Sequence, residues 1–307
     1  MKNLFKFFIA FLLVFSTFSP VSASALENNT SMETNFESYI EKAGIEYGLT
    51  ENIISEPVIT TLSIPVEESI ESESSRAITT VVVETTISAL TGTTPQMIVK
   101  HKIVGVSNAA AIKSTVIGQD LRKRTTRNGS FGLVNLNPAS FVISTKDLKV
   151  GKVFEATAPI TTTQFWQAKA VVSIVGSSGN IARDESETEI LLFNKKGDPY
   201  PYYKDPYSYI ENSEPESTIL PYLPPGDPRR TQRDSNLRAN YIKWYEDKFN
   251  IKLNWKNFDL HHIQPIAYGG NNDYSNFIPL PSTFHKTVNS WWRGYGSYSV
   301  SENEDDY

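Results

Sequence analysis

Between residues 77 and 194, apolar and β-branched side chains gather in short runs that polar turns separate. Across residues 167–174, polar and apolar positions partly alternate, which is the two-residue period of a strand with one buried face. Asn128-Gly129 favours a tight hairpin, and residues 176–180 favour a looser turn. The runs predict strands over residues 79–87, 97–104, 140–144, 165–175 and 189–193. So many short strands predict a β-rich middle domain with an antiparallel, sandwich-like or barrel architecture.

A helical period replaces the alternation after residue 226. Large apolar residues recur there at steps of three and four, so they should form one buried stripe on a helix that runs to about residue 249. The stripe consists of Leu237, Tyr241, Trp244, Tyr245 and Phe249. An aromatic stripe of this kind is more typical of a packed core than of a surface on which bases stack.

The residues that follow predict a small α+β unit, so that residues 227–295 form a second domain. Serine is a favourable helix cap and proline is tolerated in a first turn, so Pro281-Ser282 should open the last helix. The predicted order is a strand over residues 258–263, a turn at 269–272, a strand over 277–280 and a helix to about 292.

The start of the chain is typical of a secretory signal peptide. Residues 1–25 combine Lys2 and Lys6 with an apolar run over 7–18 and small residues at 23–25. The alternative is an uncleaved anchor, but the run is shorter than the roughly 20 residues that span a bilayer. We therefore expect a secreted protein. The absence of cysteine from all 307 residues favours a Gram-positive bacterium and excludes disulfides and thiolate metal sites.

Three further stretches carry no visible chemistry. Residues 26–76 are acidic and weakly patterned, which favours a tether or propeptide. Residues 195–226 are rich in proline and tyrosine, which favours a semi-stiff linker whose tyrosines could pack against a neighbouring domain. Residues 296–307 form an acidic tail.

Charge separates the last domain from the rest of the chain. Residues 227–295 carry ten Lys+Arg against six Asp+Glu, whereas residues 26–226 carry 17 against 24. A basic module in an acidic protein is the pattern expected where phosphates are bound. A second basic run, residues 122–127, could contact an anionic partner, but such a run is more often a solvated loop.

Three of the four histidines lie within residues 259–289, DLHHIQPIAYGGNNDYSNFIPLPSTFHKTVN. Adjacent strand residues point to opposite sides, so His261 and His262 should have different roles. His285 and Asn289 are four residues apart and share one helix face. One histidine of the doublet could bind a metal ion together with these two, and the other could act as a base towards water. The fourth histidine, His101, has no acidic residue or histidine near it in sequence and is expected to be structural.

With its histidine doublet, glycine turn, asparagine and helical histidine, this segment resembles the HNH endonuclease superfamily. It resembles the DNase colicins and many HNH toxin and phage-associated nuclease domains, and the resemblance covers about residues 227–295, less than a quarter of the chain. The resemblance implies a ββα-metal fold in which His261 and His285 bind a divalent metal ion and His262 is the general base. It also implies that Asn276 pins the loop and orients that base.

The resemblance extends to residues around this centre. Asn289 falls where the third metal ligand sits, which is a histidine in the DNase colicins, so the metal could be Mg²⁺, Mn²⁺, Ni²⁺ or Zn²⁺. Asp259 matches an acidic residue that holds a ligand or an arginine. Arg230 or Arg233 could bind phosphate, and the sequence does not choose between them.

The resemblance implies a secreted, metal-dependent endonuclease that cuts mainly DNA with little sequence preference. Its use could be scavenging or attack on rival bacteria, and a toxin could require an immunity protein. Two alternatives remain open. The module could bind nucleic acid without cutting it, or the β-rich domain could carry the main function, as in a cell-surface adhesin with a vestigial tail.

Overall fold

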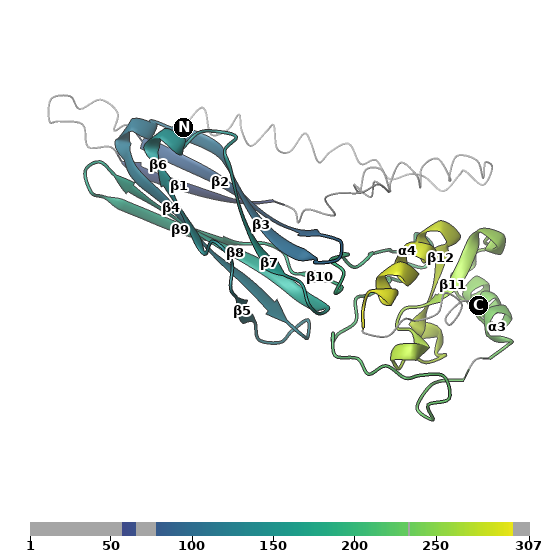
Figure 1. Ribbon diagram of the computed structural model, residues 1–307. Coiled ribbons are helices and arrows are strands. Elements are labelled where there is room, and N and C mark those ends of the chain that lie inside the picture. Colours follow the sequence, from purple (N-terminus) through teal and green to yellow (C-terminus); the bar gives the residue numbers. More distant parts are fainter. Residues whose placement is uncertain (1–56, 66–77, 233, 297–307) are drawn as a thin grey trace. The chain divides into compact units, whose positions relative to one another are not determined.

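The computed structural model describes residues 57–65, 78–232 and 234–296, and all of these belong to one compact unit, Leu49–Tyr307 (Figure 1). The expected signal peptide, most of the acidic segment 26–76, Arg233 and nearly all of the acidic tail lie outside the described residues. No helix within the described ranges is long and apolar enough to cross a membrane.

The first part of the described chain contains two antiparallel sheets (Figure 1). The strands of one sheet, in spatial order, are β1 (Val58–Pro65), β2 (Ile78–Leu90), β3 (Gln96–Ser107) and β7 (Val153–Pro159). Those of the other are β10 (Leu191–Phe193), β8 (Gln164–Gly176), β4 (Ile112–Arg124) and β5 (Gly132–Val134), with β6 (Ser140–Ser144) paired to β4 and β9 (Ile181–Glu187) paired to β8. The expectation of a β-rich, antiparallel domain is therefore confirmed.

The inward faces of the two sheets form the core of this sandwich. Ile87 and Val99 of one sheet share a hydrophobic cluster with Leu121 and Trp166 of the other, and all four side chains are buried. A second cluster joins the sheets nearer β1, β6 and β9. Each fully buried aliphatic side chain contributes about 1.5–3 kcal/mol, so the sandwich rests on these alternating positions.

Several strands were not among those expected. β1 lies within the acidic stretch that was expected to be a tether, and it pairs with β2 over its whole length. β4, β5, β7 and β9 were also missed. In β4 the core-facing positions include Thr115 and Gln119, so the hydrophobic alternation that marks a strand is broken there. The loop expected at residues 122–127 is wrong for its first half, because β4 continues to Arg124.

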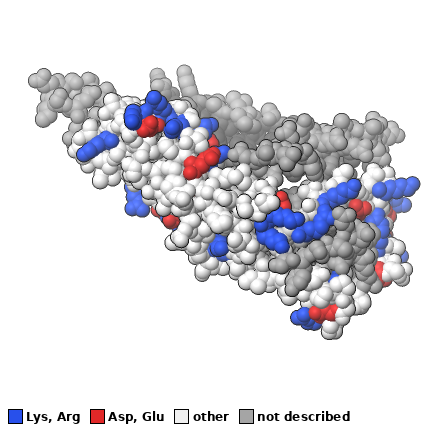
Figure 2. Space-filling view, in the orientation of Figure 1, with Lys and Arg blue, Asp and Glu red and all other residues white. Residues whose placement is uncertain are grey.

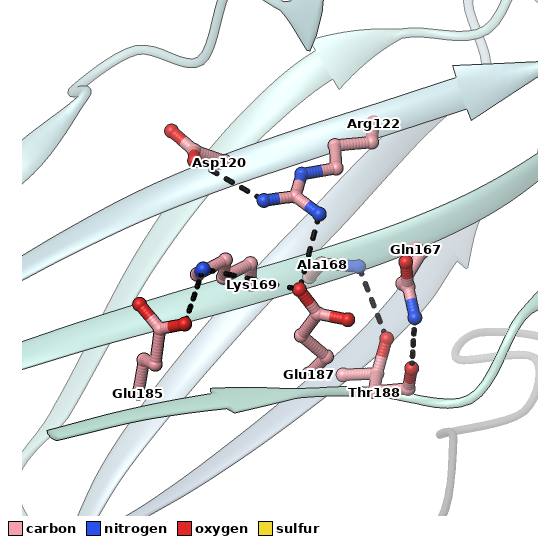
Figure 3. Close-up of polar contacts among 8 residues, drawn as sticks. All are labelled: Asp120, Arg122, Gln167, Ala168, Lys169, Glu185, Glu187 and Thr188. Atoms are coloured by element: carbon pink, nitrogen blue, oxygen red, sulfur yellow. Dashed lines mark hydrogen bonds and ion pairs between the residues drawn. The ribbon is translucent and has the colours of Figure 1, made fainter. Parts of the chain in front are cut away.

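Charged side chains hold the outer face of the second sheet in register (Figure 3). Arg122 lies 3.1 Å from Glu187 and 3.7 Å from Asp120, and Lys169 lies 2.6 Å from Glu185. The pairs with Glu187 and Glu185 join β4 and β8 to β9, whereas Asp120 and Arg122 lie on the same strand. Each exposed pair is worth about 0–1 kcal/mol, so their main effect is to favour this register over a slipped one.

The second part of the described chain contains two α-helices and one hairpin (Figure 1). These elements are α3 (Leu237–Phe249), β11 (Phe258–His262), β12 (Phe277–Pro281) and α4 (Ser282–Arg293). Short 3-10 turns in this part lie at Trp255–Asn257, Ile266–Tyr268 and Tyr274–Asn276. Two further 3-10 turns, Ala109–Ala111 and Thr145–Asp147, belong to the β-sandwich. The strand–turn–strand–helix order expected from the sequence is present, with β11 and β12 antiparallel. Pro281 rather than Ser282 occupies the cap of α4, and no side chain caps that end.

The expected aromatic stripe packs as core. Leu237, Tyr241 and Tyr245 of α3 are buried, and they form a cluster with Leu260 of β11 and Phe277 of β12. Trp244 and Phe249 pack against the cluster from its edge. The helix therefore packs against the hairpin through this stripe, and the buried stripe cannot stack on bases.

The proline- and tyrosine-rich stretch 195–226 packs on the C-terminal elements. The rings of Tyr200 and Trp291 meet edge to face at 4.8 Å, and the backbone N–H of Leu223 donates to the carbonyl of Ala267 at 2.7 Å. The carboxylate of Asp205, which is fully buried, accepts a hydrogen bond from the hydroxyl of Tyr245 on α3. The stretch thus packs against the elements of the C-terminal module, in part through its tyrosines.

Candidate metal centre and catalytic histidine

Strand β11 presents its polar side chains on two opposite faces. Asp259 and His261 are two residues apart and share one face, while His262 faces the other way. The contacts agree with this alternation, because His261 lies beside His285 of α4 and His262 lies beside Phe277 of β12. The two members of the doublet therefore have different surroundings, as their adjacency predicted.

A chain of three polar side chains joins β11 to α4. Nδ1 of His285 lies 3.1 Å from Oδ2 of Asp259, and Nε2 of His285 lies 3.1 Å from Nδ1 of His261. An ionised carboxylate can only accept, so His285 donates from Nδ1 to Asp259. The lone pair of a neutral His285 then lies on Nε2, and it points towards His261.

Burial keeps this pair of imidazoles free of water. His261 is fully buried and His285 is 3% exposed. The pKa of His261 is held well below its ordinary value, first by burial and then by the charges that His285 and His262 carry when protonated. His261 is therefore neutral, and its Nδ1 donates to the lone pair of His285 in the metal-free protein, so a metal ion bound between the two rings would require that proton to move to Nε2. Its Nε2 is buried with no hydrogen-bond partner in the part of the chain that the structure describes.

The donor set suits a divalent metal ion. Two nitrogens that bind one tetrahedral ion at 2.0–2.1 Å are about 3.4 Å apart, close to the 3.1 Å between His261 and His285. Asp259 would hold the ligand imidazole of His285 through its far nitrogen, Nδ1, as carboxylates do behind metal-binding histidines.

Asn289, the expected third ligand, lies one turn after His285 on α4 and is half-buried. The described ranges contain no group of three or more His, Cys, Asp or Glu around one position, whereas the expected set has two imidazoles and an amide.

His262 lies on the other face of β11. It is fully buried, and its ring centroid lies 4.2 Å from that of Phe277. Its Nε2 lies 3.2 Å from the side-chain oxygen of Asn272 in the loop between the strands. Its other nitrogen, Nδ1, is buried in this structure, so a water molecule has to gain access to it before a proton can be exchanged there.

Asn276 pins the loop that carries these contacts. Its side-chain oxygen accepts from the backbone N–H of Gln264, and its amide nitrogen donates to the carbonyls of Gln264 and Asn271. Gly270 is required where the loop folds back, because a Cβ there would lie 1.8 Å from the carbonyl oxygen of Gln264. Asn276 therefore ties the two ends of this loop together. The side-chain contact to His262 comes from Asn272, which the sequence indicated only as a turn residue.

Of the two arginines expected to bind phosphate, Arg230 has another contact and Arg233 lies outside the described residues. Arg230 donates to the carbonyl of Leu223 at 3.1 Å, Arg229 pairs with Asp227, and Arg233 lies outside the described residues. On the face seen in Figure 2, Lys and Arg side chains form a band over the region of α4. Lys286 on that helix is exposed. Positive charge is thus present at the surface of the module.

The chain matches no family model, no curated protein and no solved structure. The assignment of a function therefore rests on the residues and their geometry.

Proposed function

We propose that the protein is a secreted, divalent-metal-dependent endonuclease of the HNH type, which hydrolyses phosphodiester bonds, mainly in DNA. The observation that carries the proposal is the pairing of His261 on β11 with His285 on α4 at 3.1 Å, while His262 turns to the opposite face of the same hairpin. A hairpin and helix that separate a pair of ligand imidazoles from a third imidazole provide both a metal site and a base.

In this proposal His261, His285 and the amide oxygen of Asn289 hold the metal ion, and Asp259 orients His285. The metal, when bound, neutralises charge on the phosphate and on the leaving oxygen. His262 removes a proton from the attacking water, which a neutral imidazole can do near pH 7. Asn276 keeps the loop in place, so that this imidazole meets the attacking water in a fixed direction.

Substrate choice follows from charge rather than from base contacts. The ten Lys+Arg of residues 227–295 exceed the six Asp+Glu, and the described helices leave Lys286 exposed. Backbone contacts of this kind supply affinity without sequence information, so cleavage should show little sequence preference. The export of the enzyme suits either scavenging or attack on other bacteria.

The test is plasmid nicking by the chain from Leu26, with Mg²⁺, Mn²⁺, Ni²⁺ or Zn²⁺ against EDTA. We expect metal-dependent cleavage that His262→Ala abolishes. His101→Gln is the matched control, because it removes a fully buried imidazole of the β-sandwich and leaves the sequence of the C-terminal module unchanged. Equal activity in wild type and His262→Ala would overturn the mechanism. No cleavage of plasmid, single-stranded DNA or RNA under any metal would leave a non-catalytic binding module or a surface protein.

A further inference from the structure

We propose that Asn272 is a positioning residue that holds His262 in one tautomer, with the proton on Nε2 and the lone pair on Nδ1. The inference rests on the proposed function for its catalytic consequence, but its structural content can be tested in the metal-free protein. It concerns a residue outside the metal-binding set and outside the loop-pinning set.

The orientation of the Asn272 amide follows from its second partner. Its Nδ2 donates to the backbone carbonyl of Gln232 at 2.9 Å, and a carbonyl oxygen can only accept. The nitrogen of the amide must therefore face Gln232, which places the oxygen towards His262 at 3.2 Å. Because that oxygen can only accept, Nε2 of His262 must carry the proton.

The ring of His262 is thereby fixed in two ways. Phe277 packs against it at 4.2 Å between centroids and limits its tilt, and Asn272 fixes which nitrogen carries the proton. A neutral imidazole with Nε2 protonated has its lone pair on Nδ1. The base atom of the proposed mechanism is therefore Nδ1. This atom is buried in the structure, so the mechanism requires the attacking water to reach it when substrate binds. Loss of Asn272 would let the two tautomers mix.

Asn272 is itself held by the loop and by a neighbouring segment. Asn276 donates to the carbonyl of Asn271, directly before Asn272 in the chain. The hydroxyl of Thr231 donates to the carbonyl of Gly270 at 2.9 Å, so the segment 231–232 is bonded to the loop at two points. These hydrogen bonds hold the side-chain oxygen of Asn272 in a fixed position relative to the imidazole of His262.

Three variants separate this role from a general effect on the loop. Asn272→Ala removes the oxygen that accepts from His262, and Asn272→Asp keeps an acceptor oxygen but loses the donor to Gln232. Asn271→Ala is the matched control, because Asn271 is the preceding asparagine and its side chain bonds to Asp273 instead. The first readout is the ¹H–¹⁵N long-range spectrum of the histidine rings at neutral pH without metal. The second is single-turnover cleavage of a DNA duplex with metal.

We expect His262 to show the Nε2-protonated pattern in wild type, Asn272→Asp and Asn271→Ala, and a mixture of tautomers in Asn272→Ala. We expect Asn272→Ala to lower the cleavage rate about tenfold or more with the KM for DNA little changed, because misplacing a reacting group costs rate rather than affinity. Asn272→Asp should recover most of that rate.

Four outcomes would overturn the inference. These are an Nδ1-protonated His262 in wild type, an unchanged tautomer in Asn272→Ala, an equal loss in Asn271→Ala, and a gain of activity in Asn272→Ala. The last would mean that the bond to Gln232 restrains access to the site. If no variant, wild type included, cuts DNA, the proposed function fails while the ring spectra still decide the role of Asn272.

Discussion

Nε2 of His285 lies 3.1 Å from Nδ1 of His261, although 24 residues separate them in the chain. This contact joins the first strand of the β11–β12 hairpin to the helix that follows the hairpin. The far nitrogen of His285 is bonded to Asp259, so the direction of its near nitrogen is set by a residue on the same strand as His261. In the proposed function, these two elements and three side chains would define the position of the metal ion.

Removal of the carboxylate behind His285 should weaken metal binding without removing a ligand. We expect Asp259→Asn to lower the affinity for Zn²⁺ or Mn²⁺ by about 10–100-fold, because the imidazole loses its orientation and part of its basicity. His285→Ala should abolish specific binding, and His262→Ala should retain it. Isothermal titration calorimetry measures all three. Asp247→Asn, on the exposed face of α3, is the control, and an equal loss there would contradict the assignment of Asp259.

The close approach of the backbone at Gly270 predicts that one added methyl group lowers the stability of the protein. A Cβ at Gly270 would lie 1.8 Å from the carbonyl oxygen of Gln264, which is backbone and cannot move aside alone. We expect Gly270→Ala to destabilise the protein by about 3 kcal/mol and to displace Asn272 from His262. Urea unfolding and plasmid cleavage measure the two effects. Gly132→Ala is the control, because its Cβ would meet only an ordinary contact at 3.8 Å.

Periodicity predicted the elements around the site well. The steps of three and four in residues 237–249 correspond to the buried face of α3, and the strand alternation placed His261 and His262 on opposite faces. Both results depend only on local geometry, which the sequence carries directly. The same reasoning missed β4, because Thr115 and Gln119 face the core there and interrupt the apolar pattern.

Contacts made by loop side chains could not be predicted in the same way. Asn271 and Asn272 both suit a turn, and nothing local shows that one bonds to Asp273 and the other to His262. That difference arises only when Gln232, forty residues away, packs against the loop. Asp205 is a similar case, since an acidic residue in a proline-rich stretch is normally solvated, but here it is fully buried.

His101 should make the stability of the sandwich depend on pH. It is fully buried between Thr85 and Gln119, both neutral, and burial lowers its pKa from 6.5 to about 4. Above pH 6.5 neither state carries the proton. As pH falls towards 4, the unfolded chain binds the proton first, so stability is lost across this window by up to about 3 kcal/mol. Below pH 4 no further loss comes from this group.

The measurement is urea unfolding between pH 7.5 and 4 in wild type and His101→Gln. Carboxylates titrate in both proteins, so the difference between them isolates the histidine. We expect the difference in unfolding free energy to narrow as pH falls, because only wild type loses the contribution of a neutral His101. A constant difference across the window would show that His101 does not carry this pH dependence.

Asp205 should be the main polar anchor of the stretch 195–226. Its carboxylate accepts from the hydroxyl of Tyr245 and from the backbone N–H of Ser208, and it is fully buried. Asp205→Ala would leave both donors without an acceptor in the core, so we expect a loss of about 3 kcal/mol in unfolding free energy.

Glu211→Ala is the matched control in the same stretch, because Glu211 pairs with Lys204 where both are exposed and such a pair contributes about 1 kcal/mol at most. Urea unfolding followed by tryptophan fluorescence, which reports on Trp291 beside Tyr200, distinguishes the two variants. Similar losses for both would mean that the stretch is held by its aromatic contacts rather than by this carboxylate.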